Sequence, residues 1–149
     1  MRERWPPGWR RPEAVFAGLH DALLVGYEVD GERGRLILSL RPHHGSAPGP
    51  FRIEFEGVFA HRFDAPLLPA IVLDLEQAPA QALIEEEWDD IQLRARRNGW
   101  PGGPWKIGDL QAARAWVERE GLKAYWLSSS YGLDGWILAR SVHMAAEQP

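Results

Sequence analysis

The sequence predicts an α+β domain, with a mainly antiparallel sheet of about six strands and two helices packed on one face. Three observations support this fold class. Apolar residues alternate with period two in the first half of the chain and again near its end, which is typical of strands. Between these regions the apolar period lengthens to three and four residues, which indicates helices. Short turn sequences join the expected strands, which favours antiparallel neighbours.

Length and composition place further bounds on the protein. The 149 residues suit one domain, which we assign to residues 13–145, and the Pro-, Trp- and Arg-rich residues 1–12 predict an extended arm. The chain has no cysteine, which excludes disulfides and a cysteine nucleophile and fits a cytoplasmic protein. It has neither an apolar run of membrane-spanning length nor the apolar segment of a signal peptide, so we expect no membrane association.

Charge bears on the expected partners. The formal net charge is −4, from 21 acidic and 17 basic residues. A nucleic-acid-binding domain needs a concentrated basic face to neutralise phosphates, so we expect no nucleic acid partner. A basic protein suits this balance better.

Four strands are expected in the first half of the chain, over residues 22–29, 35–40, 51–63 and 70–77. The turn between the first two, at 30–34, contains two glycines. Period-two spacing places Leu23, Val25, Tyr27 and Val29 on one face of the first strand. In the third strand, Gly57 predicts a bulge or a close approach by another element.

Two helices are expected next, over residues 80–98 and 109–121. In the first, Ile84, Trp88, Ile91 and Ala95 step by four, three and four residues and line one face, and the sequence Asn98-Gly99 favours a stop. Asp109 has the side chain of an N-cap for the second.

The last two strands, over 122–130 and 135–142, flank the sequence "SSSYGLDG". A serine nucleophile of the α/β-hydrolase kind needs Gly-x-Ser-x-Gly between a strand and a helix, and that context is absent. The Gly and Asp residues are typical of a hairpin turn. We therefore expect a hairpin with Tyr131 exposed at its tip, where it is a candidate for binding a partner; a ligand-binding lip is the alternative.

Two histidines are the catalytic candidates. His20 is followed by Asp21, a carboxylate that could orient an imidazole acting as a general base. His61 lies on the apolar face of the expected 51–63 strand and would need a polar partner if buried, such as Asp64, Asp74 or Glu76. Each histidine has an alternative interpretation as a structural hydrogen-bonding residue. No phosphate-binding or zinc motif occurs, so we expect no cofactor and no metal site.

The candidate partner-binding surface is the acidic first half of the 80–98 helix with two loop tryptophans. The acidic residues are Glu85, Glu86, Asp89 and Asp90, and the tryptophans are Trp100 and Trp105. A row of carboxylates attracts a basic partner, and tryptophan is a frequent hot-spot residue. The alternatives are a solvated helix face and, for the tryptophans, a role in covering the sheet.

Three stretches resemble small bacterial proteins of the kind related to polymorphic-toxin immunity proteins. They are residues 19–21, the sequence "RIEFEGV" in the 51–63 strand and "SSYGLDGW" in the last hairpin. This resemblance implies a compact α+β module and carries no catalytic residues.

These observations support two main hypotheses. The first is a protein-binding module, of which a toxin-neutralising immunity protein that occludes its target is one form. The second is an enzyme or small-molecule binder with a pocket between sheet and helices that uses a His–carboxylate pair. Homo-oligomerisation through an open sheet edge is a further possibility.

Overall fold

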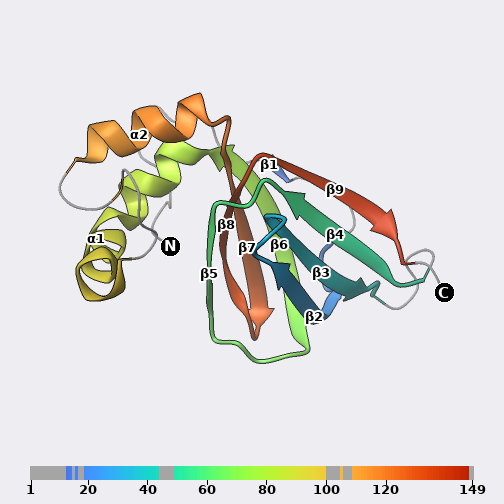
Figure 1. Cartoon of the computed structure of the whole chain (residues 1–149). Coiled ribbons are helices and arrows are strands. Elements are labelled where there is room, and N and C mark those ends of the chain that lie inside the picture. Colours follow the sequence, from blue (N-terminus) through green and yellow to red (C-terminus); the bar gives the residue numbers. More distant parts are fainter. Residues whose placement is uncertain are drawn as a thin grey trace.

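The computed structural model describes residues 13–14, 16, 19–43, 49–99, 105 and 109–147 (Figure 1). The strands are β1 (Glu13–Ala14), β2 (Leu23–Asp30), β3 (Arg35–Arg41), β4 (Phe51–Glu56), β5 (Ala60–Asp64), β6 (Ala70–Pro79), β7 (Lys123–Tyr131), β8 (Asp134–Ala139) and β9 (Ser141–Ala146). The helices are α1 (Ala80–Asn98) and α2 (Leu110–Arg119). The arm expected at 1–12 and the position of Trp100 lie outside the described residues.

The α+β class and the antiparallel sheet are confirmed, but the number of strands is not. Eight strands follow one another in the order β5-β8-β7-β6-β2-β3-β4-β9, and the short β1 pairs with β6. The expectation of about six is wrong because two long strands each bend and count twice. The expected 51–63 strand forms β4 and β5, and the last strand continues into β9.

These two bent strands pair with each other along their whole length. β5 pairs with β8, and β4 pairs with β9. At the bend the Phe59 amide donates to the Leu138 carbonyl (2.9 Å), and the Arg140 amide donates to the Glu56 carbonyl (3.0 Å). Gly57 has φ +62° at this bend, and a Cβ there would lie 2.9 Å from Arg140. The close approach that was one of the two alternatives predicted from Gly57 is confirmed. The strands that change direction here fold the sheet into a half-closed barrel.

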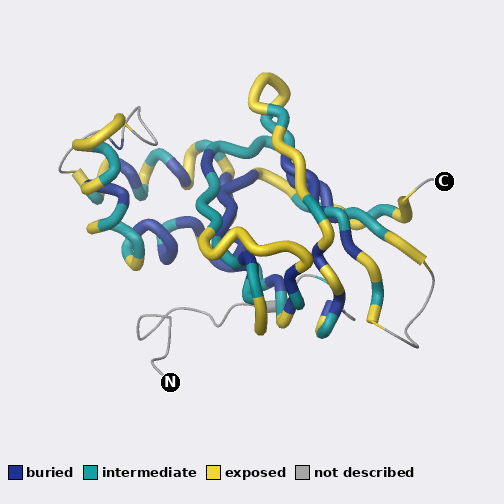
Figure 2. Tube along the Cα trace, turned by 90° about the horizontal axis from the view of Figure 1, so that it is seen from below, coloured by how far each residue is buried: buried dark blue, intermediate teal, exposed yellow. Residues whose placement is uncertain are grey.

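The curved sheet separates two apolar cores. The core inside the curve, which we call the barrel core, includes Leu38, Phe55, Leu75, Tyr125 and Ile137. The Phe55 and Tyr125 rings meet edge to face at 5.2 Å, although β4 and β7 are not neighbours in the sheet. Figure 2 shows that buried positions lie mainly in the strands and on helix faces, whereas many connections are exposed.

The second core, the helix-side core, lies on the outer face of β7 and β8. It joins Trp126 and Trp136 of these strands to Leu83 and Ile84 of α1 and Val117 of α2. The helices therefore cover the part of the sheet that contains β5, β7 and β8, as Figure 1 shows. The expected packing of both helices on one face is confirmed.

The expected end of α1 and start of α2 are also confirmed, whereas α2 ends at Arg119, two residues before the expected end. Gly99 is a left-handed C-cap of α1, and its amide donates to the Ala95 carbonyl. The Asp109 carboxylate caps α2 by accepting a hydrogen bond from the Ala112 amide. Within the described residues, neither helix is long and apolar enough to span a membrane.

The expectation that Leu23, Val25, Tyr27 and Val29 share one face of β2 is wrong. A β-bulge between Leu24 and Gly26 shifts the alternation, so Leu24 enters the barrel core while Leu23 lies on the opposite face. Beyond the bulge, Tyr27 pairs with Leu38, which lies in the barrel core. Period-two counting fails here because one extra residue exchanges the two faces.

Candidate functional site

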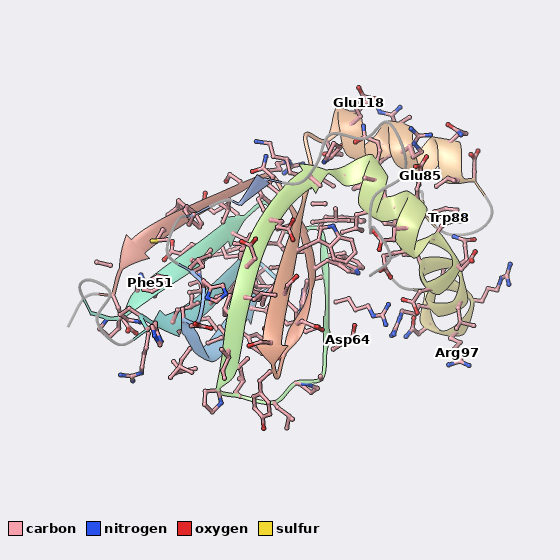
Figure 3. All side chains as sticks on the ribbon, turned by 180° about the vertical axis from the view of Figure 1, so that it is seen from behind. Phe51, Asp64, Glu85, Trp88, Arg97 and Glu118 are labelled. Atoms are coloured by element: carbon pink, nitrogen blue, oxygen red, sulfur yellow. The ribbon has the colours of Figure 1, made fainter. Side chains whose placement is uncertain are left out.

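The acidic residues of α1 take part in ion pairs that hold the fold together. Arg62 on β5 lies 2.8 Å from Asp90 and 3.2 Å from Glu87. Glu85 lies 3.0 Å from Arg114 of α2. Figure 3 shows Glu85 on α1 beside α2. Two of the four acids expected to dock a partner, Glu85 and Asp90, therefore attach α1 to α2 and to β5.

The other two predicted acids remain at the surface. Glu86 and Asp89 are exposed on α1. They lie on a helix whose neighbouring carboxylates are already matched by arginines, so the net negative field of this face is weaker than the sequence suggested.

The placement of Trp105 corrects its prediction as a partner-binding residue. Its side chain is fully buried, with its ring 5.3 Å from Phe59 and 6.3 Å from Trp116. Its carbonyl accepts a hydrogen bond from Gln92 (3.2 Å). Because burial of so large an apolar side chain is strongly favourable, Trp105 packs into the helix-side core, which agrees with the alternative covering role that its sequence left open.

His61, on β5, lines two concavities of the surface. One, of about 250 Å³, lies against the β2–β3 turn, and the other, of about 320 Å³, is lined also by Tyr27 and Arg94. Burial lowers the pKa of His61, since a charged imidazole loses its hydration there. The neutral imidazole is therefore the favoured form.

Two of the three carboxylates expected to partner His61 bind other groups, and the third, Glu76, lies on β6 opposite Trp126 of β7. Asp64 contacts Arg62 at 3.4 Å, and Asp74 accepts a hydrogen bond from the Leu75 amide (2.8 Å). The neighbour of the His61 ring is Phe63, with centroids 5.2 Å apart. Within the described chain the structure thus gives His61 no carboxylate to orient it as a general base.

His20 and Asp21 do form the pair that their adjacency suggested. The Nδ1 atom of His20 lies 3.1 Å from the Asp21 carboxylate, and both side chains are well exposed. Asp21 has φ +65°, and this backbone conformation brings the two side chains together. The pair lies at the surface, where water competes for both groups.

A different His–carboxylate pair, which the sequence did not suggest, occurs on β4 and β9. The Nε2 atom of His143 lies 2.8 Å from Glu54, whose side chain is almost fully buried. The same carboxylate contacts Arg35 at 3.3 Å and Arg52 at 3.0 Å. Sequence signals for this cluster were weak, because it depends on β3, β4 and β9 being neighbours and β9 was not separately expected.

This cluster also brings possible metal ligands together. Ligand atoms of Glu54, Glu56 and His143 lie within 4.8 Å of one another. An imidazole and two carboxylates suit a cation such as Zn²⁺. Glu54, however, is already neutralised by two guanidinium groups, which would compete with a cation for its oxygens.

An exposed apolar surface lies at the end of the sheet opposite the helices. Tyr131 at the end of β7 is 57% exposed, and Leu67 and Leu68, in the connection between β5 and β6, are 58% and 40% exposed. We call these three residues the apolar end. Figure 1 shows that the connection crosses the end of β7 and β8. The exposure predicted for Tyr131 is confirmed.

The backbone beneath the apolar end is closely packed. The Leu133 amide donates to the Leu67 carbonyl (3.2 Å), and a Cβ on Gly132 would lie 2.5 Å from that carbonyl. The hydroxyl of Ser129 donates to the Leu133 carbonyl (2.6 Å), which ties the turn further. The stretch "SSSYGLDG" is therefore a hairpin turn, as expected, and its Ser129 has a structural role.

Comparisons with known proteins inform the fold and leave the activity open. No protein-family model matches the chain, and no curated protein does. The chain is similar to the crystal structure of an uncharacterized protein from Neisseria gonorrhoeae, with a TM-score of 0.50 and 9% sequence identity. The similarity covers 93% of this chain and 100% of that one. At this identity the likeness shows a shared fold alone.

Proposed function

We propose that the protein is a protein-binding module whose contact surface is the apolar end. One observation carries the proposal: Tyr131, Leu67 and Leu68 expose apolar side chains together at one end of the sheet. Grouped apolar side chains at a surface are typical of protein–protein contacts, and tyrosine is a frequent hot-spot residue.

The close packing beneath the surface supports this proposal. The hydrogen bond from Leu133 to Leu67 joins the two connections that carry the exposed side chains. A surface already fixed before binding loses less conformational entropy when a partner docks. The apolar end is thus suited to recognition as a rigid unit.

We further infer that the module acts in the cytoplasm as an immunity-type protein, which neutralises a toxin by covering its active site. The resemblance of three stretches to immunity proteins motivates this specific form. The exposed Glu86 and Asp89 lie away from the apolar end, on α1, so their part would be to steer a basic toxin during approach.

Capture experiments with matched variants test the proposal. The full chain serves as bait in a lysate of the source organism, beside Tyr131→Ala, Leu67→Ser and Leu93→Ser baits. Leu93 is a matched control, because it is an exposed leucine (46%) on α1, away from the apolar end. We expect a partner retained by the wild type and by Leu93→Ser, and at least about tenfold weaker binding by Tyr131→Ala.

The outcomes separate binding from its immunity-type form. Equal capture by all four baits, or no specific capture, contradicts binding at the apolar end. A partner that is an enzyme inhibited by one equivalent of this protein supports the immunity-type form. A partner that keeps its activity in the complex leaves the binding module standing and contradicts toxin neutralisation.

A further inference from the structure

The outer edge of β9 is an open sheet edge. Within the described chain, β9 pairs with β4 and with no other strand, and it ends the path of the sheet. Figure 1 shows β9 along the margin of the molecule, on the side away from the helices. An open edge offers backbone donors and acceptors to another strand.

The register identifies which backbone groups face outward. The Glu147 amide donates to the Pro50 carbonyl (3.1 Å), next to the pair formed by Phe51 and Ala146. In an antiparallel ladder, hydrogen-bonded pairs alternate with non-bonded ones. The amides and carbonyls of Val142, Met144 and Ala146 therefore point away from β4.

The edge lacks the features that usually prevent strand addition. β9 has the sequence "SVHMAA", with no proline, lysine, arginine or acidic residue. Proteins commonly protect an edge with such residues or with a bulge. Met144, an apolar residue near the centre of the strand, is instead 39% exposed.

We propose that β9 pairs with β9 of a second copy of this chain, in antiparallel register about a two-fold axis at Met144. This register brings all three outward residues into hydrogen-bonded pairs, since Val142 meets Ala146 of the other copy and Met144 meets its own counterpart. Two sheets then join into one continuous sheet across the axis.

The side chains favour a second copy as the occupant of this edge. On the face of the barrel core, each Val142 lies opposite a small Ala146, and the two exposed Met144 side chains cover each other. On the other face, His143 lies opposite Ala145, so no like charges meet. The edge is therefore complementary to itself in size and in charge.

Sedimentation velocity of the purified full chain tests the proposal. We expect the wild type to form a dimer as its concentration rises. Met144→Arg and Met144→Glu should each be monomeric, because like charges then face each other at the axis. An equimolar mixture of the two variants should recover the dimer, since opposite charges then meet. Leu93→Arg, which places the same charge on α1, should remain dimeric.

Amide hydrogen exchange adds a readout of the register. The amides of Val142, Met144 and Ala146 should be protected in the wild type and lose protection in Met144→Arg. Circular dichroism checks that each variant is folded, and recovery of the dimer by mixing also requires folded variants. A wild type that is monomeric up to its solubility limit, or a dimer that survives Met144→Arg, would overturn the proposal. The former result would leave the edge to a strand of a different protein.

Discussion

Gly57 and Arg140 lie against each other where the two long strands bend. The left-handed backbone at Gly57 turns β4 into β5, and the missing Cβ leaves room for the Arg140 side chain. Arg140 in turn contacts Glu120 at the end of α2 at 2.6 Å. This glycine therefore combines two requirements, a positive φ and a close approach, that no other residue meets without cost.

Alanine substitutions at Gly57 and Gly121 separate the cost of the positive φ from the cost of the close approach. Gly121 has a similar φ of +66°, but a Cβ there would meet nothing within 4 Å. We expect Gly121→Ala to lower the free energy of unfolding by about 1–2 kcal/mol through backbone strain alone. Gly57→Ala should lose about 1–3 kcal/mol more, because its Cβ would overlap Arg140. Urea denaturation measures both values, and equal losses would show that the contact with Arg140 is unimportant.

Among the side chains, the sequence predicted exposure best where the local turn determines it. Tyr131 follows a strand and precedes a glycine, so its exposure could be inferred from neighbouring residues. Trp105 lies in a segment rich in proline and glycine, and its burial depends on Phe59, which is distant in sequence, and on Trp116 of α2. Glu54 has the alternating position of a solvent-facing residue, yet two arginines and a histidine cover it.

α1 shows at the level of one element how charge can stabilise a fold. Its acids meet arginines on two different elements, Arg62 of β5 and Arg114 of α2. Arg62 and Asp90 are both partly buried, so water and salt screen their attraction less than at an exposed pair. The acidic residues of this helix therefore attach it to the rest of the protein at least as much as they form a surface for partners.

A double-mutant cycle on Arg62→Ala and Asp90→Ala measures this attachment. We expect a coupling free energy of about 1–2 kcal/mol, because the pair is partly buried and Arg62 also contacts Glu87. The control cycle uses Arg33 and Asp30, an exposed pair in the β2–β3 turn, where water and salt screen the charges and the coupling should be clearly weaker. Similar couplings in the two cycles would contradict a special role for Arg62.

Element types were predictable from the sequence, whereas the number of strands and their neighbours were not. Apolar period and capping residues such as Asp109 are local signals, and both helices follow them. The division of one expected strand into β4 and β5 follows from a bend that only the partner strand reveals. The cluster at His143 depends on the same partner strand, which explains why the sequence pointed to His61 and His20 instead.

At the scale of the whole molecule, the barrel core and the helix-side core share one wall. Along β7, Tyr125 and Leu127 face the barrel core, while Ala124 and Trp126 face the helix-side core. Loss of packing on either side of this wall removes support from the other. The two cores should therefore unfold as one cooperative unit.

The distribution of tryptophans makes this cooperativity measurable. The tryptophans at 88, 105, 116, 126 and 136 all belong to or pack against the helix-side core. In a background with Trp5, Trp9 and Trp100 changed to phenylalanine, fluorescence reports that core, whereas far-ultraviolet circular dichroism follows the whole fold. We expect the two probes to give one coincident urea transition.

Paired core variants then test the coupling directly. Leu38→Ala creates a cavity in the barrel core, and Leu83→Ala creates one in the helix-side core. Each should lower the free energy of unfolding by about 2–5 kcal/mol, since both leucines are fully buried. Each variant should move the fluorescence and dichroism midpoints together. The reason is that β7 and β8 contribute to both cores, so lost packing in one core also destabilises the other. If Leu83→Ala shifts the fluorescence transition to lower urea while most of the dichroism change stays at the wild-type midpoint, the helices unfold on their own. The barrel would then be the independent folding unit, to which α1 and α2 are attached.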